Sequence, residues 1–194
     1  MGDLESIMEK LSEFSRIAFC EYIGRPSLEI EEFRFFSYGS NLNECKFRTD
    51  TKESGYEFGL EKAEKRTLDN YKRIFGNKSK KHGLAFTICP SKSCQVQGIC
   101  HNIPLKGLTS FLKKEGVLLK EPTYDLIIVS IPGEKHPVLT LRGLKPSNLE
   151  KLSCREKLKA YCYVESSILG AKVWNVDYAD MQKLKDRLEK EFCE

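Results

Sequence analysis

The sequence contains no apolar run long enough for a transmembrane helix, and its first residues lack a signal-peptide pattern. These two absences lead us to expect a cytoplasmic protein. Eight cysteines are present. Without a secretory segment we expect them to be reduced thiols and not an obligatory disulfide framework.

Motifs for metal and cofactor binding are also lacking. There is no Walker loop and no glycine fingerprint for a dinucleotide. His82, Cys89, Cys94, Cys100 and His101 are near one another, but they include no CxxC pair, and adjacent strand residues point to opposite faces of a sheet. The cysteines suit small apolar strand positions better than a zinc site, and a thiol–histidine nucleophile has no local motif. We expect no metal and no cofactor.

The 194 residues are typical of one globular domain with a substantial core, since 40% are hydrophobic and 31% are charged. The net charge of +4 is unevenly distributed: residues 1–32 carry eight acidic and three basic side chains, a balance of −5 that leaves +9 for the remainder. A basic body favours anionic ligands. The lysines and arginines are scattered and accompany no nucleic-acid-binding motif, so we expect no nucleic-acid partner.

Residues 1–32 are expected to form an acidic helical extension, and residues 33–194 the main domain. Apolar side chains at helical spacing predict an amphipathic helix over residues 3–19, with a stripe formed by Leu4, Ile7, Met8, Leu11, Phe14, Ile17 and Ala18. This stripe would cover the body of the same domain or a second subunit in a homodimer. The first six residues loosely match a myristoylation pattern, but their acidic neighbours oppose binding to anionic lipid, and we expect no membrane partner.

The most informative stretch is an aromatic strand that breaks into a polar turn. Phe35 and Phe36 suit a buried strand, whereas Gly39 and Asn41 tolerate positive φ. If a helix starts near residue 44, its N-terminal N–H groups point in the same direction as those of the turn, which suits a carboxylate or a phosphate. The stretch therefore predicts a substrate cradle. The alternative is a strand end with a good turn and no ligand.

Other elements follow from local patterns. Residues 44–68 are polar and predict short helices or loop. Alternation predicts a hairpin of residues 83–89 and 95–103, with Pro90 ending its first strand and Gly98 marking a bulge or a close approach by backbone or ligand. The remaining predictions are strands at 71–75 and 137–141, a central strand buried on both faces at 124–131, helices at 105–114 and at 155–169 up to Gly170, and a last helix marked by Tyr178, Met181, Leu184, Leu188 and Phe192.

An acid at the end of the helix over residues 105–114 is a candidate for chemistry. Glu115 shares a helix face with Leu108 and Leu112, whereas Lys113 and Lys114 point elsewhere. The glycine that follows is expected to end the helix in a left-handed conformation. An inward-facing carboxylate must be hydrogen-bonded, ion-paired or raised in pKa, and a raised pKa suits a general acid or base near neutral pH. The alternative is a helix-end glutamate that turns to solvent.

Five motifs occur in an order that resembles a known family. They are F-x-YGSNL, YKRIFGNKSKKHGLAFTI, VQGI, LTSFLKKEGV-x6-Y and Y-x6-GA. Together, over residues 33–192, they resemble the γ-glutamylcyclotransferase superfamily. The resemblance implies an α+β fold with a mixed, barrel-like sheet flanked by helices, to which the N-terminal helix is extra. It also implies an enzyme that cyclises a small-molecule γ-glutamyl substrate to 5-oxoproline and releases the amine, without metal or cofactor.

The resemblance also implies site residues. Substrate binding falls on Phe35, Phe36, Ser37, Tyr38, Gly39, Ser40, the adjoining Asn41 and Tyr163, and the catalytic general acid/base is Glu115. The chain departs from the family at Phe35, where an aromatic hydroxyl is common, and at Ser37, which is usually small and apolar. It also lacks an aspartate often found before Glu115. The identity of the leaving amine stays open, and a non-catalytic binding module of the same fold is the alternative function.

Overall fold

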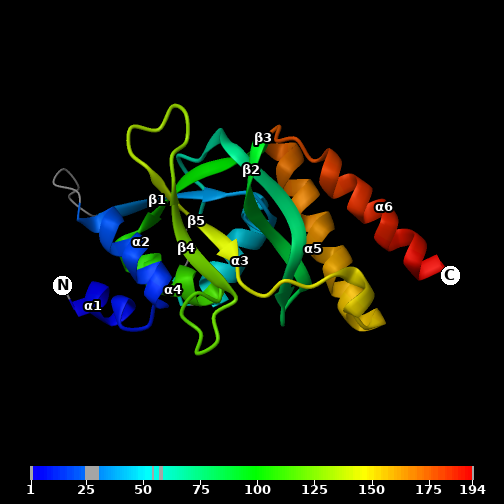
Figure 1. Ribbon diagram of the computed structural model, residues 1–194, viewed down its shortest axis with the longest axis horizontal. Helices are drawn as coiled ribbons and strands as arrows, with labels where there is room; N and C mark the ends of the chain where they lie inside the picture. Colours follow the sequence, from blue (N-terminus) through cyan, green and yellow to red (C-terminus); the bar gives the residue numbers. More distant parts are fainter. Residues whose placement is uncertain (1, 25–30, 54, 57–58, 194) are drawn as a thin grey trace.

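The computed structural model describes residues 2–24, 31–53, 55–56 and 59–193. In these residues five strands form one sheet in the order β2-β3-β1-β5-β4, in which β1 and β5 run parallel and the other neighbours antiparallel (Figure 1). The strands are β1 (Glu32–Ser37), β2 (Glu64–Ser79), β3 (Gly83–Pro104), β4 (Tyr124–Val129) and β5 (Val138–Gly143).

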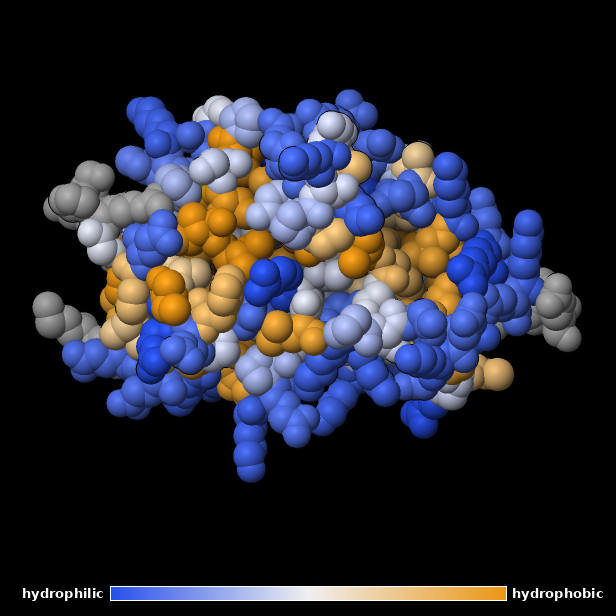
Figure 2. All heavy atoms as spheres, viewed as in Figure 1, coloured by the Kyte–Doolittle hydropathy of each residue, from blue (hydrophilic) through white to orange (hydrophobic). Residues whose placement is uncertain are grey.

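Helices flank the sheet at both ends of the molecule (Figure 1). They are α1 (Gly2–Met8), α2 (Glu13–Ile23), α3 (Glu44–Glu53), α4 (Leu105–Lys114), α5 (Cys154–Val173) and α6 (Ala179–Cys193), with short 3₁₀ helices η1 (Ser40–Leu42) and η2 (Leu149–Lys151). Hydrophilic side chains cover most of the outline of the viewed face, and hydrophobic residues reach the surface toward its middle (Figure 2). The arrangement confirms the expected α+β class with a mixed, flanked sheet and an additional N-terminal helix. Each helix in the described ranges is too short or too polar to cross a bilayer.

β1 is the central strand, and its aromatic side chains form the middle of the core. Phe33, Phe35 and Phe36 are each at most 1% exposed. Burying a phenylalanine side chain contributes about 1.5–3 kcal/mol to folding. The strand pairs with β3 on one side and with β5 on the other. The end of β1, where the polar turn begins, is therefore held by packing and by strands on both sides.

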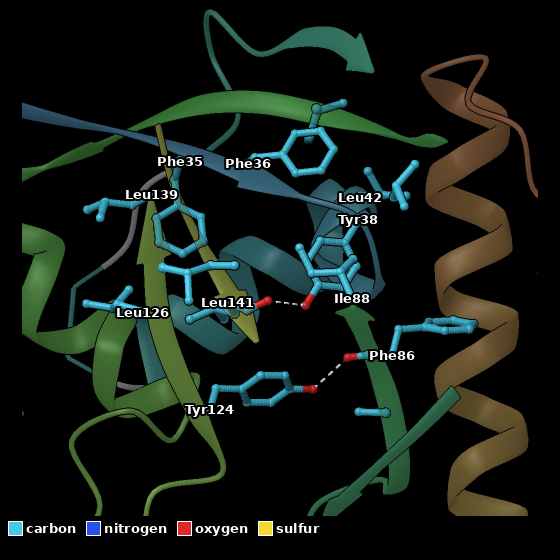
Figure 3. Packing of buried hydrophobic residues seen from close by; sticks show 14 of the residues in the cluster. Phe35, Phe36, Tyr38, Leu42, Phe86, Ile88, Tyr124, Leu126, Leu139 and Leu141 are labelled. Atoms are coloured by element: carbon cyan, nitrogen blue, oxygen red, sulfur yellow. Dashed lines mark hydrogen bonds between the residues drawn. The ribbon is translucent and has the colours of Figure 1, made fainter. Parts of the chain in front are cut away.

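The sheet curls, so that strands far apart in its order meet. Tyr124 of β4, at one edge, donates its hydroxyl to the carbonyl oxygen of Phe86 in β3 at 2.9 Å. Tyr38, just after β1, donates to the carbonyl oxygen of Leu141 in β5 at 2.6 Å. Figure 3 shows both bonds within the hydrophobic cluster. Because buried polar groups need partners, the bond from Tyr124 helps to hold the curled sheet as a half-barrel, and the bond from Tyr38 ties the turn to the neighbouring strand β5.

β2 and β3 are longer than predicted and pair with each other, so the hairpin predicted within residues 83–103 is wrong. β3 continues through Pro90, which pairs with Tyr71 beside a register shift in β2. Proline is tolerated at such irregularities because the hydrogen-bond ladder is already interrupted. A Cβ on Gly98 would lie 2.3 Å from the carbonyl oxygen of Ser37. This contact confirms the predicted close approach of backbone.

β4 is an edge strand, so the prediction of a central strand at residues 124–131 is wrong. Helix α2 packs against the strand and accounts for its burial. Ser15 of α2 accepts a hydrogen bond from the amide N–H of Leu126 at 3.0 Å and donates one to Asp125 at 3.0 Å. An edge strand leaves backbone groups unpaired, and here a helix side chain satisfies one of them. Burial on both faces does not require a strand on each side.

The helix predicted over residues 3–19 is divided into two. α1 ends at Met8, and α2 begins after Ser12, whose side chain caps the second helix. The ring of Phe19 stacks on that of Phe33 with 5.5 Å between their centroids. The polar residues between the helices favour a cap over a continuous helix, and α2 packs against the body of the same chain.

A glycine is predicted to end both α4 and α5, and the structure confirms this for α4 only. α4 occupies residues 105–114 as predicted, and Gly116 beyond it has a φ of 74° in the left-handed region. α5, however, continues through Gly170 to Val173. A Cβ on Gly170 would lie 2.3 Å from the backbone of Leu42. That glycine permits close packing between α5 and η1 and does not end the helix.

Candidate active site

A cavity of about 650 Å³ lies beside the turn that follows β1. Its walls include the end of β1, η1, the start of β3, the end of α4 and one face of α5. All the residues predicted for the site line it, namely Phe35, Phe36, Ser37, Tyr38, Gly39, Ser40, Asn41, Glu115 and Tyr163. The fold thus brings the contiguous turn segment together with two residues from distant parts of the chain.

Glu115 caps α4 and faces the cavity. Its Oε1 accepts a hydrogen bond from Nδ2 of Asn41 at 3.0 Å and lies 3.0 Å from Nζ of Lys114. The same Nζ donates to Oδ1 of Asn41 at 2.7 Å, so the three side chains form a closed ring of contacts. The Glu115 side chain is 13% exposed. The acid predicted to face inward is therefore both hydrogen-bonded and ion-paired.

Helical phase predicts that Lys114 points away from Glu115. This prediction is wrong, because the ammonium group of Lys114 lies at the site. Its side chain is 8% exposed, and its Nζ lies 4.5 Å from the centroid of the Phe47 ring. Burial lowers the pKa of Lys114, and the charge of Glu115 opposes this shift. A lysine side chain is long enough to fold back past the end of its helix. Helical phase locates its Cβ and does not locate its ammonium group.

Tyr163 of α5 presents its hydroxyl to the turn. The oxygen accepts a hydrogen bond from the amide N–H of Phe86 at 3.2 Å, and a Cβ on Gly39 would lie 2.7 Å from it. Burial raises the pKa of Tyr163 to about 12, although hydrogen bonds from Phe86 and Ser40 act in the opposite direction. The phenol is therefore protonated at neutral pH and has one hydrogen bond to donate.

Ser37 faces a buried histidine. Its Oγ lies 2.8 Å from Nε2 of His101, which is 0% exposed. Burial lowers the pKa of His101 to about 3, so the ring is neutral. Nδ1 has no hydrogen-bond partner within the described part of the chain. Because buried N–H groups without partners are rare, we assign the ring proton to Nε2, which leaves the Ser37 hydroxyl proton for another acceptor.

The N-terminus of α3 lies next to the turn, but the protein already uses part of it. Oδ1 of Asn43 accepts a hydrogen bond from the amide N–H of Lys46 at 3.2 Å. Nε1 of Trp174 donates to the carbonyl oxygen of Leu42 at 3.0 Å and fixes the turn from the other side. Of the two anion-binding features predicted from the sequence, the turn is consequently the better candidate.

The cavity also contains a charged cluster that the sequence pattern does not predict. Asp50 of α3 accepts hydrogen bonds from Nζ of Lys46 and, at 2.8 Å, from Nζ of Lys81. His82 packs on Tyr163 with 4.8 Å between ring centroids. Burial, assisted by the neighbouring lysines, lowers the pKa of His82 to about 3. The lysines before His82 are visible in the sequence, but nothing in the sequence connects them to α3.

The cysteines and histidines considered for zinc form no metal site in the part of the chain that is described. No group of three or more His, Cys, Asp or Glu side chains there is placed to hold a metal ion. Burial raises the pKa of the Cys100 thiol to about 12, so this group is protonated. The free thiols in the described residues are Cys20, Cys45, Cys89, Cys94, Cys100, Cys154 and Cys162.

Comparison with known proteins identifies the fold. No protein-family model and no curated protein matches the sequence. Among solved structures, a γ-glutamyl cyclotransferase matches with a TM-score of 0.57 and 22% identity, covering 80% of this chain and 87% of that one. YkqA from Bacillus subtilis matches with a TM-score of 0.59 and 18% identity, covering 89% of this chain and 58% of that one. The uncharacterized protein loc79017 from Homo sapiens matches with a TM-score of 0.55 and 23% identity, covering 80% and 87%.

Proposed function

We propose that this chain, which has the γ-glutamylcyclotransferase-like fold, is an enzyme that cyclises a γ-glutamyl amine to 5-oxoproline and releases the amine. The observation that carries the proposal is the contact between turn and acid: Nδ2 of Asn41 lies 3.0 Å from Oε1 of Glu115 in the wall of one cavity. A polar turn alone can hold an anion. A turn with a carboxylate beside it can also move a proton.

The strand end and the turn would bind the glutamyl group. Amide N–H groups between Tyr38 and Asn41 would hold its α-carboxylate or its γ-carbonyl oxygen. The Tyr163 hydroxyl supplies a further donor, and Phe35 and Phe36 supply an apolar wall. The substrate must fold so that its own α-nitrogen reaches the γ-carbonyl carbon. Such orientation can supply about 7–11 kcal/mol of a reaction barrier in favourable cases.

Glu115 serves as general base and then as general acid. It accepts a proton from the α-ammonium group, and the freed amine attacks the γ-carbonyl carbon. A new C–N bond forms, the carbonyl electrons move onto oxygen, and the N–H donors of the turn stabilise the oxyanion. In total two protons pass through Glu115 from the attacking nitrogen to the departing nitrogen. The old C–N bond then breaks, the carbonyl re-forms, and the amine leaves as an ammonium ion.

The test is to incubate the purified protein with a panel of γ-glutamyl amino acids and γ-glutamylamines and to detect 5-oxoproline by mass spectrometry. Glu115→Gln is the matched control. We expect product from the natural protein and little from the variant. A folded protein that forms no 5-oxoproline from any member of the panel contradicts the proposal and favours a non-catalytic binding module of the same fold.

We also propose that the activity is cytoplasmic. The described cysteines are free thiols, and thiols persist in a reducing compartment. Cell fractionation followed by detection of the full chain tests this location, and recovery in a secreted fraction would contradict it.

A further inference from the structure

The cavity carries a large excess of positive charge. Eight lysines and three acidic residues line it. The difference of five charges is larger than the net charge of +4 for the whole chain. The positive charge of this protein is therefore concentrated at the proposed active site.

The acids of the cavity do not cancel this excess. Asp50 is 7% exposed and bonds to two lysines, Lys46 and Lys81. Burial raises the pKa of Asp50, but the hydrogen bonds from the two lysines lower it to about 2, so one negative charge lies between two positive charges. The other two acids each face one lysine, in the pairs Glu115–Lys114 and Glu121–Lys145.

The surplus lysines lie at the outer part of the cavity. Lys78, Lys80 and Lys81 come from the end of β2 and the turn into β3, and Lys113 and Lys120 lie on either side of Glu115 in the sequence. All five are exposed while lining the cavity. The proposed cradle is deeper, because its serine and tyrosine side chains are buried. The exposed lysines would meet the part of a substrate that projects outward from its glutamyl group.

The glutamyl group itself accounts for little of this charge. It brings one carboxylate and one ammonium group, so its net charge is zero, and the proposed function assigns its carboxylate to the turn after β1. A neutral leaving amine would leave the lysine excess without a counter-charge, and a cationic one would be repelled. An anionic leaving group would match both the sign and the position of the lysines.

We propose that the leaving amine carries two or more negative charges, as an acidic amino acid or an acidic peptide does. This inference rests on the proposed function and specifies its substrate. It assigns the lysines of the β2–β3 turn to recognition of the leaving group, while the turn after β1 recognises the glutamyl group.

The test compares γ-glutamyl-glutamate with γ-glutamyl-glutamine, which are nearly identical in shape and differ by one negative charge. At low ionic strength we expect kcat/KM to be higher for the glutamate compound by about tenfold or more. Because salt screens exposed charges, the ratio should approach one at about 0.5 M sodium chloride.

Variants connect this selectivity to the lysines. Lys80→Gln/Lys81→Gln should lower the ratio of the two kcat/KM values by about threefold or more. The expected change is modest because an exposed ion pair between a lysine and the substrate contributes little free energy. The matched control is Lys92→Gln/Lys135→Gln, which removes the same charge from exposed positions outside the cavity. This control should leave the ratio unchanged. Thermal unfolding establishes that both double variants are folded.

The outcomes separate the two proposals. Equal kcat/KM for the two compounds, with 5-oxoproline formed from both, overturns the anionic leaving group and leaves the proposed function standing. Cyclisation of other members of the γ-glutamyl panel, but of neither of these two compounds, also overturns the anionic leaving group. If the folded protein cyclises no member of the panel, the proposed function fails, and titration calorimetry with the same two compounds decides the inference. Tighter binding of the glutamate compound that is lost in Lys80→Gln/Lys81→Gln supports it, and equal affinity overturns it.

Discussion

Nζ of Lys114 lies 3.0 Å from Oε1 of Glu115 and 2.7 Å from Oδ1 of Asn41. One buried ammonium group thereby joins the proposed catalytic acid to the proposed substrate turn. The cation offsets the unfavourable burial of the carboxylate. The same contacts restrict where that carboxylate can lie, which is what a proton-transferring group requires.

Replacing Glu115 by glutamine should lower kcat by about 10²- to 10⁴-fold, the usual range for a general acid–base residue. The amide keeps an oxygen for Asn41, but it leaves the buried Lys114 ammonium without its counter-charge, so the variant should also be less stable and its kinetics are measured where it is folded. Glu121→Gln is the control, because Glu121 lines the same cavity but its side chain is 83% exposed. Turnover near that of the natural protein in Glu115→Gln would remove Glu115 from the mechanism.

Replacing Lys114 by methionine should destabilise the protein. The change leaves the Glu115 carboxylate without its cation, and breaking a buried pair in this way costs about 3 kcal/mol or more. Lys113→Met is the matched control, since Lys113 is exposed on the same helix, and it should change the free energy of unfolding by less than about 0.5 kcal/mol. Urea denaturation measures both, and equal losses would show that the pair contributes nothing to stability.

Gly39→Ala should displace the turn and reduce kcat/KM. The added methyl would lie 2.7 Å from the Tyr163 oxygen, closer than real Cβ contacts allow. A shift of about 1 Å at a catalytic site can lower the rate by about 100-fold. Steady-state kinetics with the best substrate of the panel measures the effect, and unchanged kcat/KM would mean that the turn does not position substrate.

Tyr163→Phe should reduce both catalysis and stability, because it leaves the buried amide N–H of Phe86 unpaired at a cost of about 1–3 kcal/mol. It also removes the atom that a methyl on Gly39 would meet. Gly39→Ala/Tyr163→Phe should therefore lose less stability than the sum of the single variants, since substitutions in contact are not additive. Denaturation of the four proteins in this cycle tests the contact, and strict additivity would contradict it.

Gly170→Ala should be destabilising although alanine is the better helix former by about 1 kcal/mol. Its Cβ would lie 2.3 Å from the backbone of Leu42, which cannot move without disturbing η1. Leu169→Ala, at a side chain 54% exposed in the same helix, is the control and should have a small effect. A higher unfolding temperature for Gly170→Ala would contradict the close packing of α5 against η1.

Two histidines should make the protein less stable in acid. Burial lowers the pKa of His101 and of His82 from 6.5 to about 3. Between these values the unfolded chain binds more protons than the folded one. The stability is therefore complete above about pH 6.5 and declines as the pH falls, by up to about 1.4 kcal/mol per pH unit for each histidine.

Urea denaturation between pH 7 and pH 5 measures this slope. His101→Phe should reduce the slope, whereas His136→Gln, which changes an exposed imidazole, should not. Asp50 does not contribute to the slope in this pH range. Its pKa is lowered to about 2, so the stability that its ionised form contributes is lost only at lower pH. A slope in His101→Phe equal to that of the natural protein would contradict the prediction.

Predictions from the sequence succeeded where neighbours along the chain decide the structure. Helix α4 and the left-handed Gly116 after it follow from local spacing and from the freedom of glycine. They failed where distant segments decide. Pro90 is accommodated because β2 is irregular opposite it, and Gly170 stays helical because η1 packs against it.

By itself the sequence determined the aromatic strand, the polar turn after it and a glutamate directed inward at the end of a helix, because each depends on side-chain periodicity within a few residues. Only the tertiary structure decided that the turn and Glu115 share a cavity, that Lys114 joins them, and that Asp50 of α3 binds Lys81 of the turn between β2 and β3. The reason is physical. Periodicity fixes the direction of a Cβ, whereas burial and the partners of a long charged side chain depend on which distant segments pack beside it.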